Sequence, residues 1–135
     1  MMKQITDEAA EEAYKRFIDS FVQLAQSNVI ADRIQENGHS ERTNDADRPL
    51  SAQEAERKAL FLSLSPTQRQ CTADMLRDQK VGALHDLLCL MEWEVTQGDW
   101  EVATVGVPLG KSPFGSYHFD FICRSSGDDW PGSTS

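Results

Sequence analysis

Three polar side chains near the C-terminus have types and spacing suited to binding an anion or moving a proton. His118, Asp120 and Arg124 are two and four residues apart, so an extended strand would place them on one face. The other face of that strand would be apolar, and its members are Tyr117, Phe119, Phe121 and Cys123. We expect the apolar face to be buried and the polar face to be solvated, with a binding site there as the functional alternative.

A second candidate cluster centres on His85. The adjacent Asp86 completes a His-Asp dipeptide of the kind found in metal phosphohydrolases, but the further histidines of that pattern are missing. Neighbouring helical residues also point about 100° apart, so this pair alone does not chelate. Cys89 follows His85 by four residues and could share a metal with it and with His118. We expect no cofactor and assign no catalytic residue; if a metal binds, His85 and His118 are its ligands.

The remaining reactive residues point to structural roles. The three cysteines, at widely spaced positions in apolar patterns, predict reduced and buried thiols of a cytoplasmic protein. Nucleophile-elbow, phosphate-loop and zinc-protease motifs are absent from the sequence. All three tryptophans lie in the last third, where they could form a core corner or anchor an interface. Of these, Trp100 is the candidate binding residue.

The charge balance excludes several partners. A net charge of −9 without any basic stripe disfavours nucleic acid and anionic membrane surfaces. A protein partner with a basic surface is compatible, although solubility alone would explain the charge. The acidic N-terminus predicts no secretory signal, and no apolar run is long enough for a transmembrane helix.

Helical patterns occupy about residues 6–96. Thr6 is a candidate N-cap, and an apolar stripe at three- and four-residue spacing continues to about residue 34. A polar loop is expected over residues 36–50. Capping boxes at Ser51 and Ser65 start two more helices. The second of these either stops or kinks at residues 80–82, where Gly82 weakens the helix and two helices meeting is the slightly favoured alternative.

The last third changes to strand-like patterns. Residues 100–109 and 116–124 predict two antiparallel strands joined by a KSPFG turn, so the β-hairpin covers about residues 100–124. A short acidic tail over residues 125–135 closes the chain. The predicted fold is α+β, mostly helical, with three or four bundle-like helices and a C-terminal two-stranded hairpin in a single domain, 1–135.

Two segments carry a family resemblance. The stretch SPFGSYHFDFICRSSGDDWP, and also LSPTQRQ followed by ADMLRD, resembles sequences of a family of small uncharacterised bacterial proteins. The resemblance implies no activity, cofactor or site residue.

Two classes of function follow. The first is a non-enzymatic cytoplasmic protein that acts through protein contacts, as an immunity-, antitoxin- or adaptor-like molecule. The alternative is a small-ligand or metal-dependent enzyme that uses His85, His118 and Asp120, with a contribution from Arg124. Homodimerisation through an open edge of the C-terminal hairpin is compatible with either.

Overall fold

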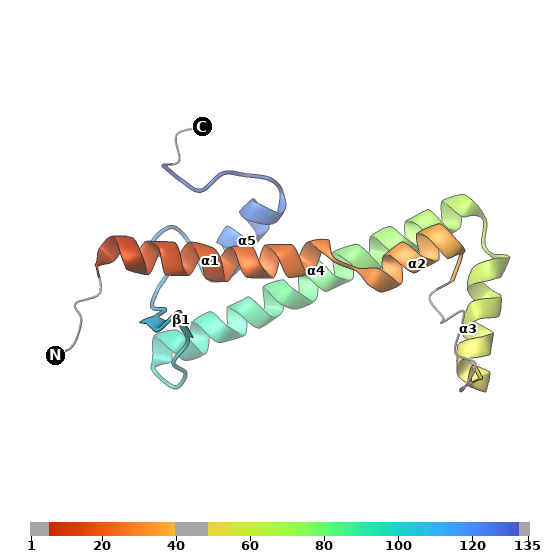
Figure 1. The fold of residues 1–135 in the computed structure, drawn as a ribbon, viewed down its shortest axis with the longest axis horizontal. Coiled ribbons are helices and arrows are strands. Elements are labelled where there is room, and N and C mark those ends of the chain that lie inside the picture. Colours follow the sequence, from red (N-terminus) through yellow and green to blue (C-terminus); the bar gives the residue numbers. More distant parts are fainter. Residues whose placement is uncertain (1–5, 40–48, 133–135) are drawn as a thin grey trace. The chain divides into compact units, whose positions relative to one another are not determined.

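The computed structural model describes residues 6–39 and 49–132, which form five helices and one small β-hairpin (Figure 1). The elements are α1 (Asp7–Gln26), α2 (Val29–Asn37), α3 (Ala52–Ser63), α4 (Pro66–Gln97), β1 (Ala103–Thr104), β2 (Val107–Pro108) and α5 (Tyr117–Ser125). The predicted class, mostly helical with a two-stranded antiparallel hairpin, is confirmed. Most of the expected loop at residues 36–50, and the last three residues of the tail, lie outside the described residues.

The chain divides into two compact units that share α4. One unit comprises residues 1–26 and 81–135, and the other comprises residues 27–80. The assignment of residues 1–135 to one domain stays a prediction.

Helix starts follow the predicted side-chain caps. The hydroxyl of Thr6 accepts a hydrogen bond from the Ala9 N–H at 3.1 Å, and the hydroxyl of Ser51 accepts one from Glu54 at the same distance. Ser65 and Gln68 cap each other reciprocally, at 2.8 and 3.1 Å. Each cap satisfies a backbone donor that the helix itself leaves free, which is why these residue types mark helix starts.

The first predicted helix is two helices, because Asn28 caps a new start. Its side-chain oxygen accepts a hydrogen bond from the Ala31 N–H at 3.0 Å, and its side-chain amide donates to the Leu76 carbonyl at 3.2 Å. In the same unit, Arg77 pairs with Asp32 at 3.0 Å. These contacts join α2 to the first part of α4.

The favoured break at residues 80–82 is wrong, because α4 is continuous from residue 66 to residue 97. Gly82 lies in an exposed part of the helix, with no neighbouring atom within 4 Å of the Cβ position that it lacks. The cost of a helical glycine, about 1 kcal/mol, is small beside the hydrogen bonds of a long helix.

The hairpin is shorter than predicted and lies wholly within the first predicted strand. Ala103 pairs with Pro108, and Thr104 pairs with Val107. The chain reverses at Val105 and Gly106, both with positive φ, 52° and 76°. Two consecutive residues in the left-handed conformation are typical of a tight hairpin turn. A β-branched residue such as Val105 is uncommon at the first of these positions, so the sequence did not predict a turn here.

The second predicted strand is a helix, α5. Ser116 caps it by accepting a hydrogen bond from the Phe119 N–H at 3.3 Å. Tyr117 and Phe121, one helical turn apart, are both fully buried, as predicted, whereas Phe119 is 58% exposed and does not belong to the core. The expected burial of Phe119 is therefore wrong, because the helix turns it away from its neighbours.

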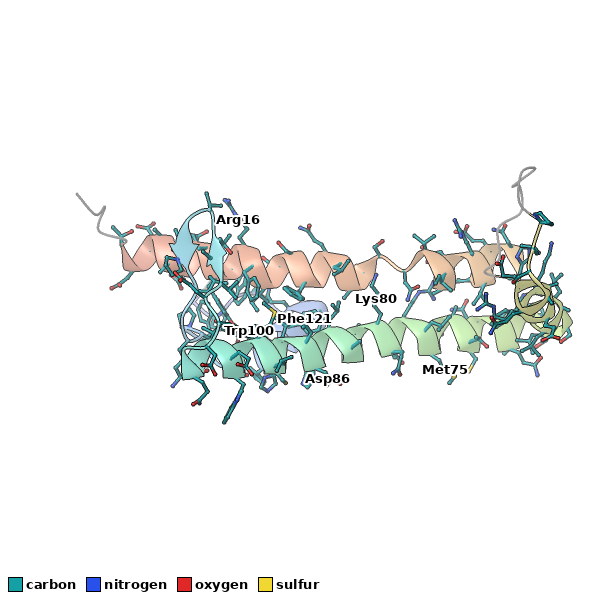
Figure 2. All side chains as sticks on the ribbon, turned by 90° about the horizontal axis from the view of Figure 1, so that it is seen from below. Arg16, Met75, Lys80, Asp86, Trp100 and Phe121 are labelled. Atoms are coloured by element: carbon teal, nitrogen blue, oxygen red, sulfur yellow. The ribbon has the colours of Figure 1, made fainter. Side chains whose placement is uncertain are left out.

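The core of this unit lies between α1, α5 and the last part of α4. Ile18, Leu88 and Tyr117 are fully buried in it, and Figure 2 shows Phe121 between α1 and α4. Trp130 from the tail stacks against Phe114, with ring centroids 5.2 Å apart. Among the tryptophans, Trp130 therefore takes the predicted core role, whereas Trp93 is 63% exposed.

Candidate metal centre

Three potential metal ligands meet where α4 and α5 approach each other. His85 and Cys89 lie one turn apart on α4, and His118 is the second residue of α5. One ligand atom from each lies within 4.8 Å of the others, and all three side chains are half-buried. The two imidazole rings are nearly perpendicular, with centroids 5.0 Å apart. We call these three residues the triad.

Glu92 fixes the start of α5 against α4, and this contact positions His118. Its Oε2 accepts a hydrogen bond from the Tyr117 N–H at 3.0 Å, so the carboxylate caps an N-terminal backbone donor of the helix. Tyr117 itself is fully buried and its hydroxyl donates to the Gly110 carbonyl. Burial, followed by the charge of Glu92, raises the pKa of Tyr117 to about 12.

Each histidine of the triad has a carboxylate near its Nδ1. Asp86 Oδ1 lies 3.1 Å from the Nδ1 of His85, and Glu92 Oε1 lies 3.8 Å from the Nδ1 of His118. A carboxylate hydrogen-bonded to one ring nitrogen orients a metal-binding imidazole, and the 3.1 Å contact of Asp86 with His85 has this length, whereas the 3.8 Å separation of Glu92 from His118 is too long for a hydrogen bond. Asp86 therefore orients its neighbour and does not chelate with it.

The triad suits a soft or borderline cation better than covalent catalysis. Burial, then the nearby charges of Asp86 and Glu92, raises the pKa of the Cys89 thiol, so the free thiol is a poor nucleophile at neutral pH. Imidazole and thiolate donors together are typical of Zn²⁺ sites. Zinc bonds of about 2.0–2.3 Å place neighbouring donors roughly 3.3–3.8 Å apart, which small side-chain rotations would reach from the present separation.

A pocket of ≈ 330 Å³ adjoins the triad. Cys89 and His118 belong to its wall, together with Glu92, Trp93, Lys111 and Ser116. In the part of the chain that the structure describes, the triad is the one group of three or more histidine, cysteine, aspartate or glutamate ligands close enough to hold a metal ion. A three-ligand site beside a cavity has the form of a metal site with an open coordination position.

The predicted His118, Asp120 and Arg124 face does not exist. A helix turns residues two positions apart to nearly opposite sides, so α5 turns His118 away from Asp120 and Arg124, which are one helical turn apart. His118 faces the triad, Asp120 is buried at 5% exposure, and Arg124 pairs with Asp19. An anion site built from the three together is therefore excluded by the helical geometry.

Asp120 is a structural acceptor in the core. Its Oδ2 accepts hydrogen bonds from the Tyr14 hydroxyl and, at 2.6 Å, from the Ser112 hydroxyl. Ser112 Oγ in turn accepts from the Phe114 N–H at 3.0 Å. Burial, followed by the hydrogen bond to Asp120, raises the pKa of Tyr14 well above its usual range. The network joins α1, the loop before α5, and α5 itself.

Arg124 holds the C-terminal tail to α1. Its Nε donates to Asp19 Oδ1 at 2.9 Å, its guanidinium carbon lies 5.1 Å from the Trp130 ring, and the Trp130 indole N–H donates to Asp19 at 3.3 Å. Arg124 also donates to the Asp128 carbonyl at 2.8 Å. These contacts give the residue a structural role.

The other candidate residues from the sequence do not belong to the triad. Trp100 is 43% exposed, and its backbone N–H donates to the Glu94 carbonyl, so its role in binding stays a prediction. The cysteines are free as expected, but Cys71 is exposed and the other two are half-buried, which corrects the prediction of three buried thiols. His39 is buried in the other unit.

Sequence reasoning missed two residues of this site, Glu92 and Lys111. Cys89 follows His85 by four residues, and Glu92 follows Cys89 by three. This spacing predicts that the three side chains share one face of a helix, so the sequence did contain a signal for Glu92. Lys111 lies in the loop after the hairpin, and its place beside the triad depends on how that loop packs. The sequence carries no comparable signal for it.

A protein-family model identifies the family of this chain. The model of a family of unknown function, DUF6547, matches residues 7–132, and the chain belongs to this family. No curated protein and no solved structure matches it. In the described residues, every helix is too short or too polar to cross a membrane.

Proposed function

We propose that this protein binds a divalent metal ion through His85, Cys89 and His118, and that Zn²⁺ is the preferred ion. The observation that carries the proposal is the approach of three donor atoms, from two helices, to within 4.8 Å of one another. The Asp86 carboxylate at the His85 Nδ1 supports it, because such a partner orients a metal-binding imidazole. Three protein ligands beside a pocket favour a site that uses its open position for a small ligand or a reaction.

The test is metal binding by matched cysteine variants. We expect the purified chain to bind Co²⁺ with a thiolate charge-transfer band, and Zn²⁺ to displace it. Cys89→Ser should remove the band and weaken binding by at least about 100-fold, since losing a ligand costs more than losing an orienting partner. His118→Ala should weaken binding similarly.

Cys123→Ser is the control for this experiment. Cys123 is also a half-buried free thiol and lies on the same helix as His118, but it is not part of the triad. Its replacement should leave the Co²⁺ affinity and spectrum unchanged. Equal affinity of the Cys89→Ser and Cys123→Ser variants would contradict the proposal.

We propose protein contact as the second candidate, in an immunity-, antitoxin- or adaptor-like protein of the cytoplasm. Its support is the apolar character of exposed side chains on α4: Leu87, Leu90 and Trp93 are 41%, 47% and 63% exposed. Exposed apolar residues grouped on one helix are typical of interaction surfaces. This surface replaces the hairpin edge as the basis for a partner or a second copy, because the hairpin strands are only two residues long.

Light scattering over a wide concentration range tests the homodimer, and a pull-down from the native host tests the partner. A constant monomeric mass together with no captured protein would leave the second candidate without support. Neither result bears on metal binding, so the two proposals are separable.

A further inference from the structure

We propose that the pocket beside the triad binds a small carboxylate, whose oxygen occupies the open coordination position of the metal. This inference rests on the proposed function, because the metal supplies one of the two contacts. The second contact is the ammonium group of Lys111, a residue that no resemblance or motif singles out. Three features of the pocket carry the argument: its wall, its charge and its size.

The wall of the pocket includes the triad itself. Cys89 and His118 line the cavity, whereas His85 does not. A metal held by all three would therefore have protein on the side of His85 and open space on the side of the pocket. Glu92 is near but is not one of the group whose ligand atoms converge, and its Oε2 already accepts from the Tyr117 N–H. The fourth position is thus left to a ligand from the pocket.

Two cationic groups at the pocket would contact an anion. Zn²⁺ and the Lys111 ammonium would be the two cationic groups here, while the Cys89 thiolate, the Glu92 carboxylate and the Asp86 carboxylate beside His85 would bring the total charge to about zero at neutral pH. Lys111 forms no ion pair with any residue in the described ranges, 6–39 and 49–132. A carboxylate that bridges the metal and Lys111 would contact both cations, and a carboxylate oxygen is an ordinary zinc ligand.

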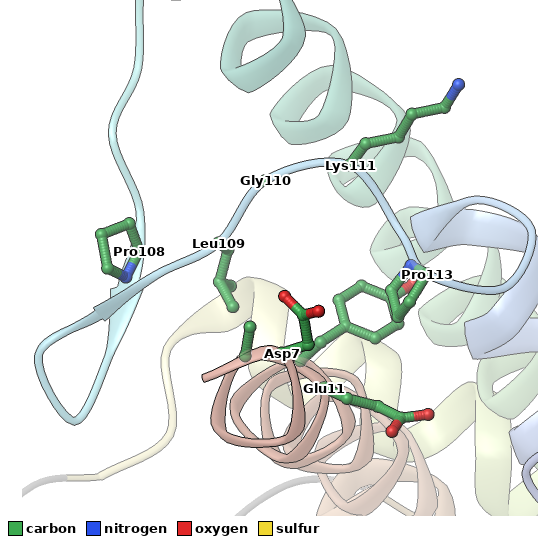
Figure 3. Close-up of a pocket in the computed structure, with 9 residues that line it drawn as sticks. Asp7, Glu11, Pro108, Leu109, Gly110, Lys111 and Pro113 are labelled. Atoms are coloured by element: carbon green, nitrogen blue, oxygen red, sulfur yellow. The ribbon is translucent and has the colours of Figure 1, made fainter. Parts of the chain in front are cut away.

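The position of Lys111 supports this assignment. The residue also borders a second pocket of ≈ 250 Å³ at the start of α1, which contains Asp7 and Glu11 (Figure 3). Figure 3 shows the Lys111 side chain extending away from both of these carboxylates. Its charge is therefore not directed to the acids of the second pocket, and the residue also lines the pocket beside the triad.

The size and remaining wall of the pocket suit an organic acid. A cavity of ≈ 330 Å³ is several times the roughly 30 Å³ that one water molecule occupies in the liquid. The indole of Trp93 adds an apolar surface for carbon atoms. A carboxylate with a short carbon chain uses all of these features, whereas a bare inorganic anion uses only the charge.

The experiment titrates the Co²⁺-loaded chain with carboxylates and with their neutral amides. Acetate and propionate should change the visible Co²⁺ spectrum saturably, and acetamide and propionamide should not. Lys111→Met should weaken carboxylate binding about tenfold, the usual effect of losing one charge-assisted contact, while Co²⁺ affinity stays the same. Lys58→Met, the same change on α3, is the matched control and should alter neither measurement.

Negative results for the metal site and for the carboxylate site are distinguishable. Absence of Co²⁺ binding to the triad overturns the proposed function and this inference together. Normal Co²⁺ binding with no response to either carboxylate overturns the carboxylate site alone. An equal response in the wild type and the Lys111→Met variant overturns the assignment of Lys111. Lys111→Arg keeps the positive charge and should retain most of the carboxylate binding.

Discussion

Replacing Asp120 by alanine should lower the free energy of unfolding by about 2–4 kcal/mol, because two buried hydroxyls lose their acceptor at a cost of roughly 1–3 kcal/mol each. The Asp120 side chain is buried and accepts from the hydroxyls of Tyr14 and Ser112. Without the carboxylate, both hydroxyls lose their acceptor in a site that water does not easily reach. The loss should appear in equilibrium denaturation curves with an unchanged slope.

The control for this prediction is Asp129→Ala, an exposed acidic residue of the same unit. It should change the free energy of unfolding by no more than about 0.5 kcal/mol. A double-mutant cycle between Tyr14→Phe and Asp120→Ala should also give a substantial coupling energy. If Asp120→Ala is as stable as Asp129→Ala, the carboxylate is not a structural acceptor and its functional interpretation regains support.

Replacing Phe121 by alanine should cost about 3–5 kcal/mol of unfolding free energy, whereas Phe119→Ala should cost no more than about 0.5 kcal/mol. Phe121 is fully buried between α1 and α4, and Phe119, two residues earlier on α5, is 58% exposed. Both variants remove the same atoms from the same helix. The difference between them therefore reports burial and not chemistry.

This pair of variants also distinguishes the helix from the predicted strand. In a strand, residues two apart share a face, so both substitutions would cost similar amounts. In a helix they lie about 200° apart, and only one of them reaches the core. Equal losses in thermal or denaturant unfolding would contradict the placement of α5.

The candidate site was predicted in part. The structure brings together His85 and Cys89, four residues apart on one helix, with His118 as the third potential ligand. The shared strand face of His118, Asp120 and Arg124 was wrong, because that grouping depended on an extended segment and residues 117–125 form a helix. Glu92 and Lys111 were missed, the first despite a helical spacing that signals it.

Local sequence determined the helix starts at Thr6, Ser51 and Ser65, because a capping side chain bonds to a backbone donor only a few residues away. Tertiary structure decided the state of residues 117–125, where apolar residues two and four apart fit either a strand or a helix. The helix is the state that buries Tyr117 and Phe121 against α1 and α4 while giving Asp120 two hydroxyl donors. The same packing brings His118 close to His85 and Cys89. The sequence of residues 117–125 alone does not predict this proximity, because it depends on where α5 packs against α4.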